Sequence, residues 1–427
     1  MITKLEIKGF KSLVDVSIEL GAVNVFIGAN GSGKSNLLEA VGVLSAIVIN
    51  GPQSESIYYR GVRVGAPSSY LSSFKTYSSD RVRILVGNAK TEYEVEFGPD
   101  PENQDRWRVF EETLWFENEV LFTIKNALLT IPARSGRPEK NITIPFLILS
   151  KTSGIKVGLI LYQSFVETSS SFPSGSSEHL KALEFSEIIN SVDVFLNELF
   201  GYCVYSPSTP ILRGSTENNP REPLGIGGSG LGHAIHDMLK VDKQKLGPFD
   251  LDDVFELIDW ANALQAGRDD EKGSNSILEA GPARIFIGDK FMGEKHKSVS
   301  LLEASEGALY VLFMLAVVGH EQSSKIFAVD NFDQSLHPRL ARELTERICD
   351  QILDDGTRQM LATTHNPLVL DGLDLLDDRI RLFTVDRDKT GASQVKRVLV
   401  TEELIDKGLS LSRLWTSGRF GGVPKYL

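Results

Sequence analysis

The residues from Gly28 to Ser35 have the spacing of a phosphate-binding loop. They are Gly-Ala-Asn-Gly-Ser-Gly-Lys-Ser, which fits the pattern G-x-x-x-x-G-K-S. An apolar run from Val23 to Ile27 precedes them, and a helix-like sequence begins at Asn36. This order matters because the turn between strand and helix aims backbone N–H groups and the helix N-terminus at a phosphate. The pattern predicts binding of a nucleoside triphosphate.

Two side chains at the end of this loop are expected to bind the phosphates and their metal ion. Lys34 would reach the β- and γ-phosphates, and the Ser35 hydroxyl would bind Mg²⁺. A nucleotide with Mg²⁺ is therefore the predicted ligand. The other loop residues expected to contact it are Asn30, Gly31, Ser32, Gly33 and Asn36.

A second Mg²⁺ ligand is expected at the end of a buried strand. The residues from Ile326 to Val329 are all apolar, and Asp330 follows them. In α/β sheets ligands bind at the carboxyl ends of the strands, so this carboxylate would lie at the binding edge. An aspartate in this position can also simply begin a loop. The phosphate loop in the same chain favours the metal role.

Composition and charge restrict the class of protein. The chain has 427 residues, 41% of them hydrophobic, which is enough for two or three structural units. Cys203 and Cys349 have no paired spacing, which is typical of the reducing cytoplasm and predicts no structural zinc. The apolar run from Ala308 to Val318 is shorter than the roughly 20 residues of a membrane span, so we expect a buried helix and no membrane partner. The net charge of -12 disfavours general binding of nucleic acid, although DNA stays possible through a local basic face.

The periodicity of apolar residues predicts three regions. Apolar and polar residues alternate over residues 1–20 and again from Arg81 to Thr130, as in an antiparallel sheet. After Lys297, buried strands and helices alternate as in an α/β fold. Helical spacing between these parts is found at 179–200, 232–240 and 250–264. The predicted regions are an N-terminal lobe over 1–165, a mainly helical insertion over 166–294 and a C-terminal lobe over 295–427.

The order of the motifs resembles that of a known family. A Ser-Glu-Gly sequence at 305–307 precedes the apolar helix, Asp330 ends the next strand, and Thr-His at 364–365 follows the strand after that. With the phosphate loop, this order resembles the ABC-type AAA ATPase heads of the RecF, SMC and OLD group. The Leu-His-Pro sequence at 336–338 is similar to compact ATPases of the OLD and antiphage-defence kind.

The resemblance covers residues 1–50 and 295–385 and implies both a fold and a mechanism. The fold would be α/β, an ABC-type P-loop ATPase head with an antiparallel β subsheet and a largely helical insertion. The cofactors would be ATP and Mg²⁺. Two heads would pair head to tail, so that Ser305 and Gly307 of one head close on the ATP of the other. His365 would sense the γ-phosphate, and Lys11 would touch the nucleotide.

Two of these residues have simpler alternatives. Ser305 also suits an ordinary helix N-cap, and the two roles are compatible. For Lys11, the alternative to contact with the nucleotide is the role of an ordinary solvated lysine at the end of a strand, and the sequence favours the two roles almost equally. The family's glutamine loop, which completes the Mg²⁺ shell, has no clear counterpart, because Gln53 lies close to the first predicted helix.

One departure from the family pattern concerns catalysis. The family usually has Asp-Glu at the end of the acidic strand, and the Glu activates the attacking water, whereas this chain has Asn331 after Asp330. Asparagine can hold a water molecule but cannot accept its proton. General-base assistance is worth about 10²–10⁴ in rate, so we expect slow hydrolysis unless Asp333 supplies the missing carboxylate.

Three further segments carry weaker signals. The residues Gly225 to Gly230 match G-x-G-x-x-G but follow a proline-rich piece instead of a strand, so we expect a turn before a helix and no dinucleotide site. A Ser-rich stretch at 169–177 predicts a surface loop or linker. The tail from Leu414 to Pro424 is expected to dock Trp415 into a core, with a partner contact as the alternative.

Together these features predict a cytoplasmic, slowly hydrolysing ATPase that forms head-to-tail dimers or higher homo-oligomers. In this hypothesis ATP binding controls a separate effector protein, such as a nuclease or toxin, in antiphage defence. The alternatives are a RecF-like DNA-repair ATPase, which would bind duplex DNA in a salt-dependent way, and a scaffold held together by ATP without hydrolysis. A small-molecule kinase is disfavoured because it would leave Ser305 and His365 unexplained.

Overall fold

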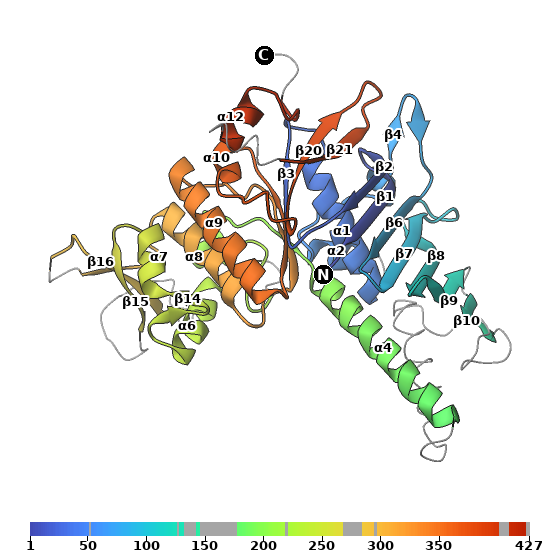
Figure 1. The fold of residues 1–427 in the computed structure, drawn as a ribbon, viewed down its shortest axis with the longest axis horizontal. Helices are drawn as coiled ribbons and strands as arrows, with labels where there is room; N and C mark the ends of the chain where they lie inside the picture. The colour runs from blue at the N-terminus through green and yellow to red at the C-terminus, as the bar shows by residue number, and fades with distance from the viewer. Residues whose placement is uncertain are drawn as a thin grey trace. The chain divides into compact units, whose positions relative to one another are not determined.

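The computed structural model forms two compact units, each assembled from segments that are distant in the sequence (Figure 1). Unit 1 contains Met1–Cys203, Arg381–Val398 and Gly421–Leu427, and unit 2 contains Val204–Ile380 and Leu399–Phe420. The described residues are 1–50, 53–125, 128–131, 142–145, 177–217, 221–267, 284–293, 297–400 and 410–423.

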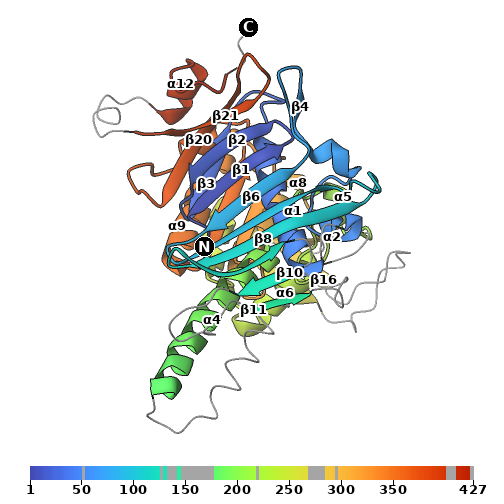
Figure 2. The ribbon, with the colours of Figure 1, turned by 90° about the vertical axis from the view of Figure 1, so that its right-hand side faces the viewer.

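An eight-stranded antiparallel sheet forms a large part of unit 1 (Figure 2). Its order is β11-β10-β9-β8-β7-β6-β1-β2, so β1 pairs with both β2 and the more distant β6. In β7 buried residues alternate with half-buried ones as far as Phe97, which agrees with the alternating pattern in the sequence. The strands are β1 (Lys4–Phe10), β2 (Leu13–Glu19), β6 (Val82–Gly87), β7 (Thr91–Pro99), β8 (Trp107–Phe116), β9 (Glu119–Lys125), β10 (Leu128–Ile131) and β11 (Ile142–Pro145).

The phosphate loop of unit 1 lies between a buried strand and a long helix. All five residues of β3 (Val23–Ile27) are buried, and α1 (Lys34–Asn50) begins within the loop sequence. Next to β3 lies β20 (Ile380–Arg387), where Phe26 stacks on Phe383 with ring centroids 5.1 Å apart. The antiparallel partner of β20 is β21 (Ser393–Val398). The predicted order of strand, loop and helix is therefore confirmed.

Two other helices of unit 1 contact α1. The helix α4 (Ser177–Gly201) contacts α1, and just beyond it the Tyr202 hydroxyl donates to the Leu38 carbonyl at 2.9 Å. The predicted Ser-rich loop at 169–176 lies outside the described residues, and Ser177 begins α4. The remaining elements are α2 (Ser54–Tyr58), η1 (Pro67–Tyr70), β4 (Ser73–Phe74) and β5 (Tyr77–Ser78).

Unit 2 contains parallel strands with helices packed beside them. The strands lie in the order β12 (Val204–Tyr205), β18 (Ile326–Val329) and β19 (Gln359–Thr363). The helix α8 (Glu306–Gly319) is buried continuously from Ala308 to Val318, as predicted, and it contacts α9 (Pro338–Asp355) (Figure 1). Among the described residues, no helix combines the length and apolar character needed to cross a membrane.

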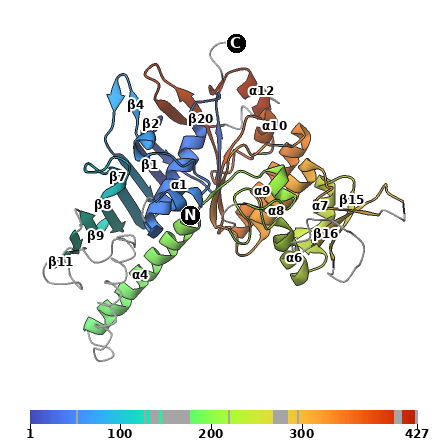
Figure 3. The same cartoon turned by 180° about the vertical axis from the view of Figure 1, so that it is seen from behind.

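A smaller group of helices and hairpins completes unit 2. In Figure 3, α6 and α7 lie beside the hairpin of β15 and β16. The helix predicted from Asp250 to Leu264 is too long: α7 ends at Leu257, and β15 begins at Ala261. The elements are α5 (Thr209–Leu212), α6 (Leu231–Val241), β13 (Lys245–Leu246), β14 (Phe249–Asp250), α7 (Leu251–Leu257), β15 (Ala261–Gly267), β16 (Arg284–Asp289), β17 (Ser298–Ser300), α10 (Pro367–Leu370) and α12 (Leu411–Thr416).

The C-terminal tail is docked, as the sequence predicts. Trp415 on α12 is buried, and the helix contacts α10 within unit 2. Asp371, just after α10, accepts hydrogen bonds from the backbone N–H of Ser412 at 2.9 Å and from its hydroxyl at 2.7 Å. Pro424 lies outside the described residues.

Candidate nucleotide-binding site

Glycines give the phosphate loop a backbone path that other residues rarely follow. Gly31 and Gly33 have φ values of 74° and 110°, in the region that favours glycine. A Cβ on Gly33 would lie 2.2 Å from the Ser393 Oγ and 2.5 Å from the Ser12 Oγ. Glycine is thus required at this position both for its conformation and for space.

The side chains of the loop are arranged around its own backbone. Lys34 is buried, and its Nζ donates to the carbonyls of Gly28 at 2.8 Å and Ala29 at 3.2 Å. The buried Ser32 hydroxyl makes no hydrogen bond within the part of the chain that the structure describes. A buried unpaired hydroxyl is costly, and a phosphate oxygen in the loop would satisfy it. The loop therefore fits an anionic ligand.

Asn36 connects α1 to the turn between β1 and β2. Its Nδ2 donates to the Ser12 Oγ at 2.8 Å, and its Oδ1 accepts from Arg63 Nη2 at 3.4 Å. These contacts give Asn36 a structural task within unit 1. Its predicted contact with nucleotide, like those of Asn30, Gly31 and Gly33, stays a prediction.

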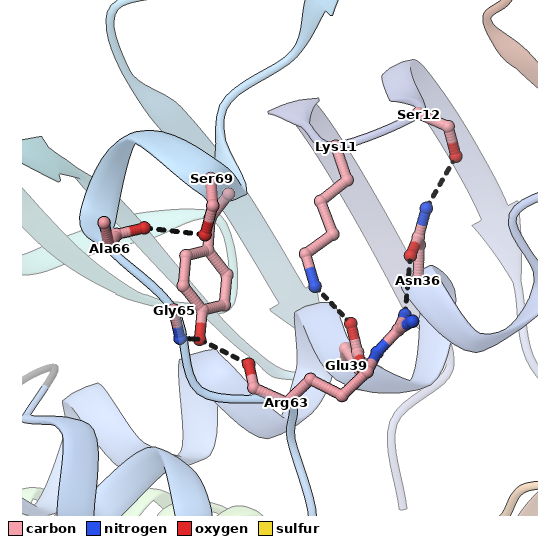
Figure 4. A network of polar contacts seen from close by, with 9 residues as sticks. Lys11, Ser12, Asn36, Glu39, Arg63, Gly65, Ala66 and Ser69 are labelled. Carbon is pink, nitrogen blue, oxygen red and sulfur yellow. Dashed lines mark hydrogen bonds and ion pairs between the residues drawn. The ribbon is translucent and has the colours of Figure 1, made fainter.

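A network of charged side chains lies beside the first turns of α1 (Figure 4). Glu39 is buried and forms ion pairs with Lys11 and with Arg63, whose Nε lies 2.5 Å from the Glu39 Oε1. The Lys11 ammonium also lies 4.7 Å from the centre of the Tyr70 ring, a cation–π contact. Tyr70 in turn donates its hydroxyl proton to the Arg63 carbonyl at 2.6 Å.

Burial and ion pairing have opposite effects on the pKa values of Glu39 and Lys11. Burial alone would raise the pKa of Glu39, but the hydrogen bonds and charges of Arg63 and Lys11 outweigh it and lower that pKa. Burial also lowers the pKa of Lys11, against the opposing effect of Glu39. Lys11 therefore is not the solvated strand-end lysine of the simpler alternative. Its predicted contact with nucleotide stays a prediction.

In unit 2, the predicted metal ligand lies at the end of its strand. Asp330 follows the fully buried β18, and its Oδ1 accepts a hydrogen bond from the Thr363 hydroxyl at 2.6 Å. The same hydroxyl oxygen accepts the backbone N–H of Asn331 at 2.9 Å. Thr363, the last residue of β19, thus orders the start of the loop after β18.

Asn331 has a conformation that explains its residue type. Its φ is 59°, in the left-handed region where asparagine is several-fold enriched among residues other than glycine. Asparagine therefore satisfies a backbone requirement at the position where the family has glutamate. No local pattern around Asn331 predicts this conformation.

Asp333 positions the residue predicted to sense phosphate. Its Oδ1 accepts the Thr364 hydroxyl at 2.7 Å and the backbone N–H of His365 at 3.1 Å. Nearby, the buried Tyr310 hydroxyl donates to the Phe332 carbonyl at 2.8 Å, and burial together with the Asp333 charge raises the pKa of Tyr310. The loop after β18 is thereby bound to the end of β19. The catalytic roles of Asp333 and His365 stay predictions.

The Ser-Glu-Gly sequence forms the N-terminus of α8. Ser305 is exposed and is the N-cap, since its Oγ accepts the Ala308 N–H at 3.3 Å. The Glu306 Oε1 accepts the Ser335 hydroxyl at 2.5 Å and the Thr209 hydroxyl at 2.6 Å, and these bonds lower the pKa of Glu306. The predicted N-cap is confirmed, and the action of Ser305 and Gly307 on a second subunit stays a prediction.

The expected Mg²⁺ ion would have only oxygen donors from the protein. Mg²⁺ is usually bound by one or two protein oxygens together with phosphates and water. The Ser35 hydroxyl of unit 1 and the Asp330 carboxylate of unit 2 are each donors of this chemical kind, and their predicted role as metal ligands stays a prediction. Within the described ranges, no group of three or more His, Cys, Asp or Glu residues could hold a metal ion. An ion held mainly by nucleotide phosphates needs no such group.

The second glycine-rich sequence, Gly225 to Gly230, is bound by a carboxylate from the preceding segment. Glu217 accepts the backbone N–H of Gly227 at 2.8 Å and the Ser229 hydroxyl at 2.5 Å. The sequence ends at Gly230, the N-cap of α6, as predicted for a turn before a helix. Glu217 thus occupies two donors of this turn, and the expectation that the turn binds no dinucleotide stays a prediction.

Sequence reasoning missed several residues that shape the site. Ser393 and Arg387 contact the phosphate loop, and Arg63 pairs with Glu39. Ser393 and Ser32 are 361 positions apart, so no local spacing could connect them. Only the fold shows that they meet.

Two comparisons with protein families now bear on this site. Residues 1–78 match the family described as "AAA ATPase domain", and residues 247–371 match the family described as "AAA domain, putative AbiEii toxin, Type IV TA system". The first match contains the phosphate loop, and the second contains the Ser-Glu-Gly sequence, Asp330 and His365. Both matched stretches are therefore similar to AAA ATPase domains.

Both matches agree with the AAA-type part of the resemblance described above. Solved structures with similar chains include the Smc head domain of Pyrococcus furiosus bound to the C-terminal domain of ScpA, at 12% identity and a TM-score of 0.46, covering 98% of this chain and 99% of that one. The SMC head domain of Thermotoga maritima is 14% identical with a TM-score of 0.41, covering 93% of this chain and 99% of that one. No curated protein matched the sequence.

The charged network predicts a pH-dependent loss of stability in Glu39→Gln. This variant leaves Lys11 without its buried counterion, so the free energy of unfolding at pH 7 should fall by about 3 kcal/mol. The pKa of Glu39 is lower in the folded protein than in the unfolded chain, where it is about 4.3. Ionisation of Glu39 therefore stabilises the fold fully above the unfolded pKa, and this stabilisation is lost as the pH falls through the folded pKa. The difference between wild type and variant should therefore shrink below about pH 4.

Urea denaturation at pH 7 and at lower pH measures this difference. Glu111→Gln is the control, because it removes a carboxylate from the exposed pair with Lys125 and should cost less than about 1 kcal/mol. A difference for Glu39→Gln that is equally small, or independent of pH, would contradict the role given to this network.

The left-handed conformation of Asn331 predicts the stability of its variants. Asn331→Gly should leave the free energy of unfolding nearly unchanged, whereas Asn331→Val should lower it by about 1–2 kcal/mol. Gln334→Val, on an exposed residue of the same loop, is the control and should change it by less than about 0.5 kcal/mol. If glycine and valine at position 331 were equally stable in urea denaturation, the conformational explanation would fail.

Proposed function

We propose that this protein is a slowly hydrolysing ATPase whose heads pair head to tail around ATP and thereby control a separate effector protein. The observation that carries the slow turnover is Asn331, which stands directly after Asp330 and cannot accept a proton from water. ATP and Mg²⁺ are the proposed cofactors. In this proposal residues 1–165 and 295–427 supply the two lobes of the ATPase, and 166–294 form an insertion between them.

Each part of the site has a separate task in this mechanism. The phosphate loop binds the phosphates through backbone N–H groups, with Lys34 adding positive charge. Mg²⁺, bound through Ser35 and Asp330, would neutralise charge that develops on the transferred phosphoryl group. His365 at the end of β19 senses the γ-phosphate, and Asp333 positions its backbone. Phosphoryl transfer depends mainly on positioning and electrostatics, so slow hydrolysis continues without a strong base.

The exposed N-terminus of α8 supports the pairing of heads. Ser305 offers a hydroxyl, and the helix N-terminus offers partial positive charge for a γ-phosphate held by a second subunit. Such pairing couples ATP binding to assembly. In the proposal, assembly determines whether the effector is held or released.

A role in antiphage defence is supported by the family description that names a toxin of a toxin–antitoxin system, matched by residues 247–371. A purely structural use of ATP is the second candidate function, and the same Asn331 favours it. In that case purified protein would carry bound ATP and release no phosphate.

Restoring a carboxylate after Asp330 should accelerate hydrolysis. Asn331→Asp keeps a side chain that tolerates the left-handed conformation and adds a possible base, so kcat for phosphate release should rise, by up to about 10². Lys34→Ala is the control that removes nucleotide binding. Fast turnover in the wild-type protein, unchanged in Asn331→Ala, would overturn the proposed slow ATPase.

Pairing of heads should depend on Ser305. Ser305→Arg places a bulky cation at the N-terminus of α8, so ATP should no longer increase the molecular mass in light scattering, while the Kd for ATP stays close to that of the wild type. Ser410→Arg is the matched control, because Ser410 is the N-cap of α12 and loses the same kind of hydrogen bond. ATP-dependent assembly that survives Ser305→Arg would contradict the head-to-tail arrangement.

A further inference from the structure

The carbonyl oxygens of the phosphate loop are bound by a hairpin near the other end of the chain. This C-terminal hairpin consists of β20, β21 and the turn at 388–392, and it belongs to unit 1 together with the loop. Arg387 Nε donates to the Gly31 carbonyl at 2.8 Å, and the Ser393 hydroxyl donates to the Ser32 carbonyl at 2.5 Å. Two successive peptide units of the loop are thus fixed from outside.

These bonds control where the loop directs its N–H groups. A trans peptide unit is planar, with its C=O and N–H pointing in opposite directions. The bond from Ser393 to the Ser32 carbonyl therefore sets the direction of the Gly33 N–H. The bond from Arg387 to the Gly31 carbonyl similarly sets the direction of the Ser32 N–H. This N–H donates within the loop to the Ala29 carbonyl at 3.1 Å. An anion site made of backbone N–H groups depends on such alignment.

The hairpin is built to hold both side chains in place. The Arg387 guanidinium also donates through Nη1 to the Gly391 carbonyl at 2.8 Å, so it bridges the hairpin turn and the loop. Asp388 stabilises this turn, since its Oδ1 accepts the Thr390 N–H at 2.8 Å and the Ala392 N–H at 3.1 Å. The buried Ser393 also donates its backbone N–H to the Ser12 carbonyl at 2.7 Å.

Close packing leaves little freedom between loop and hairpin. A Cβ on Gly28 would lie 2.2 Å from the Val385 carbonyl oxygen, and one on Gly33 would lie 2.2 Å from the Ser393 Oγ. Movement of the hairpin therefore moves the loop.

We propose that Arg387 and Ser393 are positioning residues that set the affinity of the phosphate loop for nucleotide. They do so by fixing the peptide units of Gly31 and Ser32 from the outer side of the loop. This inference rests on the proposed binding of ATP by the same loop. It assigns the C-terminal hairpin a direct part in nucleotide binding, in addition to its part in the fold.

The test compares variants of the full chain by their Kd for ATP, measured by titration calorimetry. Arg387→Gln removes a charge-assisted hydrogen bond, so the Kd should rise about tenfold, and Ser393→Ala should also raise it. Lys389→Gln is the matched control, because it removes one positive charge from the exposed hairpin turn and should leave the Kd within about twofold of the wild type.

A second measurement separates positioning from general destabilisation. In thermal unfolding, Arg387→Gln should keep the Tm of the nucleotide-free protein close to that of the wild type, while the rise in Tm on adding ATP becomes smaller. If Arg387→Gln and Ser393→Ala both bind ATP as tightly as Lys389→Gln does, the proposal is overturned. If Lys34→Ala also binds ATP normally, the nucleotide site itself, and with it the proposed function, is wrong.

Discussion

An anion held by backbone N–H groups requires that several peptide units point in one direction, and a short glycine-rich turn cannot ensure this alone. Gly31 and Gly33 give the loop its path, but glycine adds freedom to the unfolded chain and to the loop itself. The surrounding elements remove that freedom. Ser12 from the first hairpin packs against the loop, and Arg387 and Ser393 from the C-terminal hairpin bind its carbonyls.

The acidic strand end in unit 2 is ordered in a similar way. Thr363 joins Asp330 to the backbone of Asn331, and Asp333 joins the loop after β18 to the backbone of His365. The residues predicted to act on phosphate are therefore positioned through their main chain by neighbouring side chains. The left-handed backbone of Asn331 favours asparagine, and the amide of this side chain cannot accept a proton from water.

Much of the fold was predictable, because helices and strands leave a periodic pattern in their own residues. The alternation in β7, the buried helix α8 and the order of strand, loop and helix around Lys34 were all confirmed. The helix expected from Asp250 to Leu264 was wrong in its second half. There β15 pairs with β16, whose residues lie further along the chain, and such pairing does not show in local periodicity.

In the candidate site, too, the features that depend on neighbouring residues were predictable and the long-range contacts were not. The types of residue that can bind a nucleotide and its metal ion are readable in the linear sequence, because a phosphate loop or an acidic strand end is complete within a few consecutive residues. The contacts that order those residues appear only in the folded chain: Glu39 and Arg63 around Lys11, Thr363 beside Asp330, and Arg387 and Ser393 on the loop carbonyls. The physical reason is that a hydrogen bond needs its two atoms within about 3 Å, and chain segments hundreds of positions apart reach that distance only after folding.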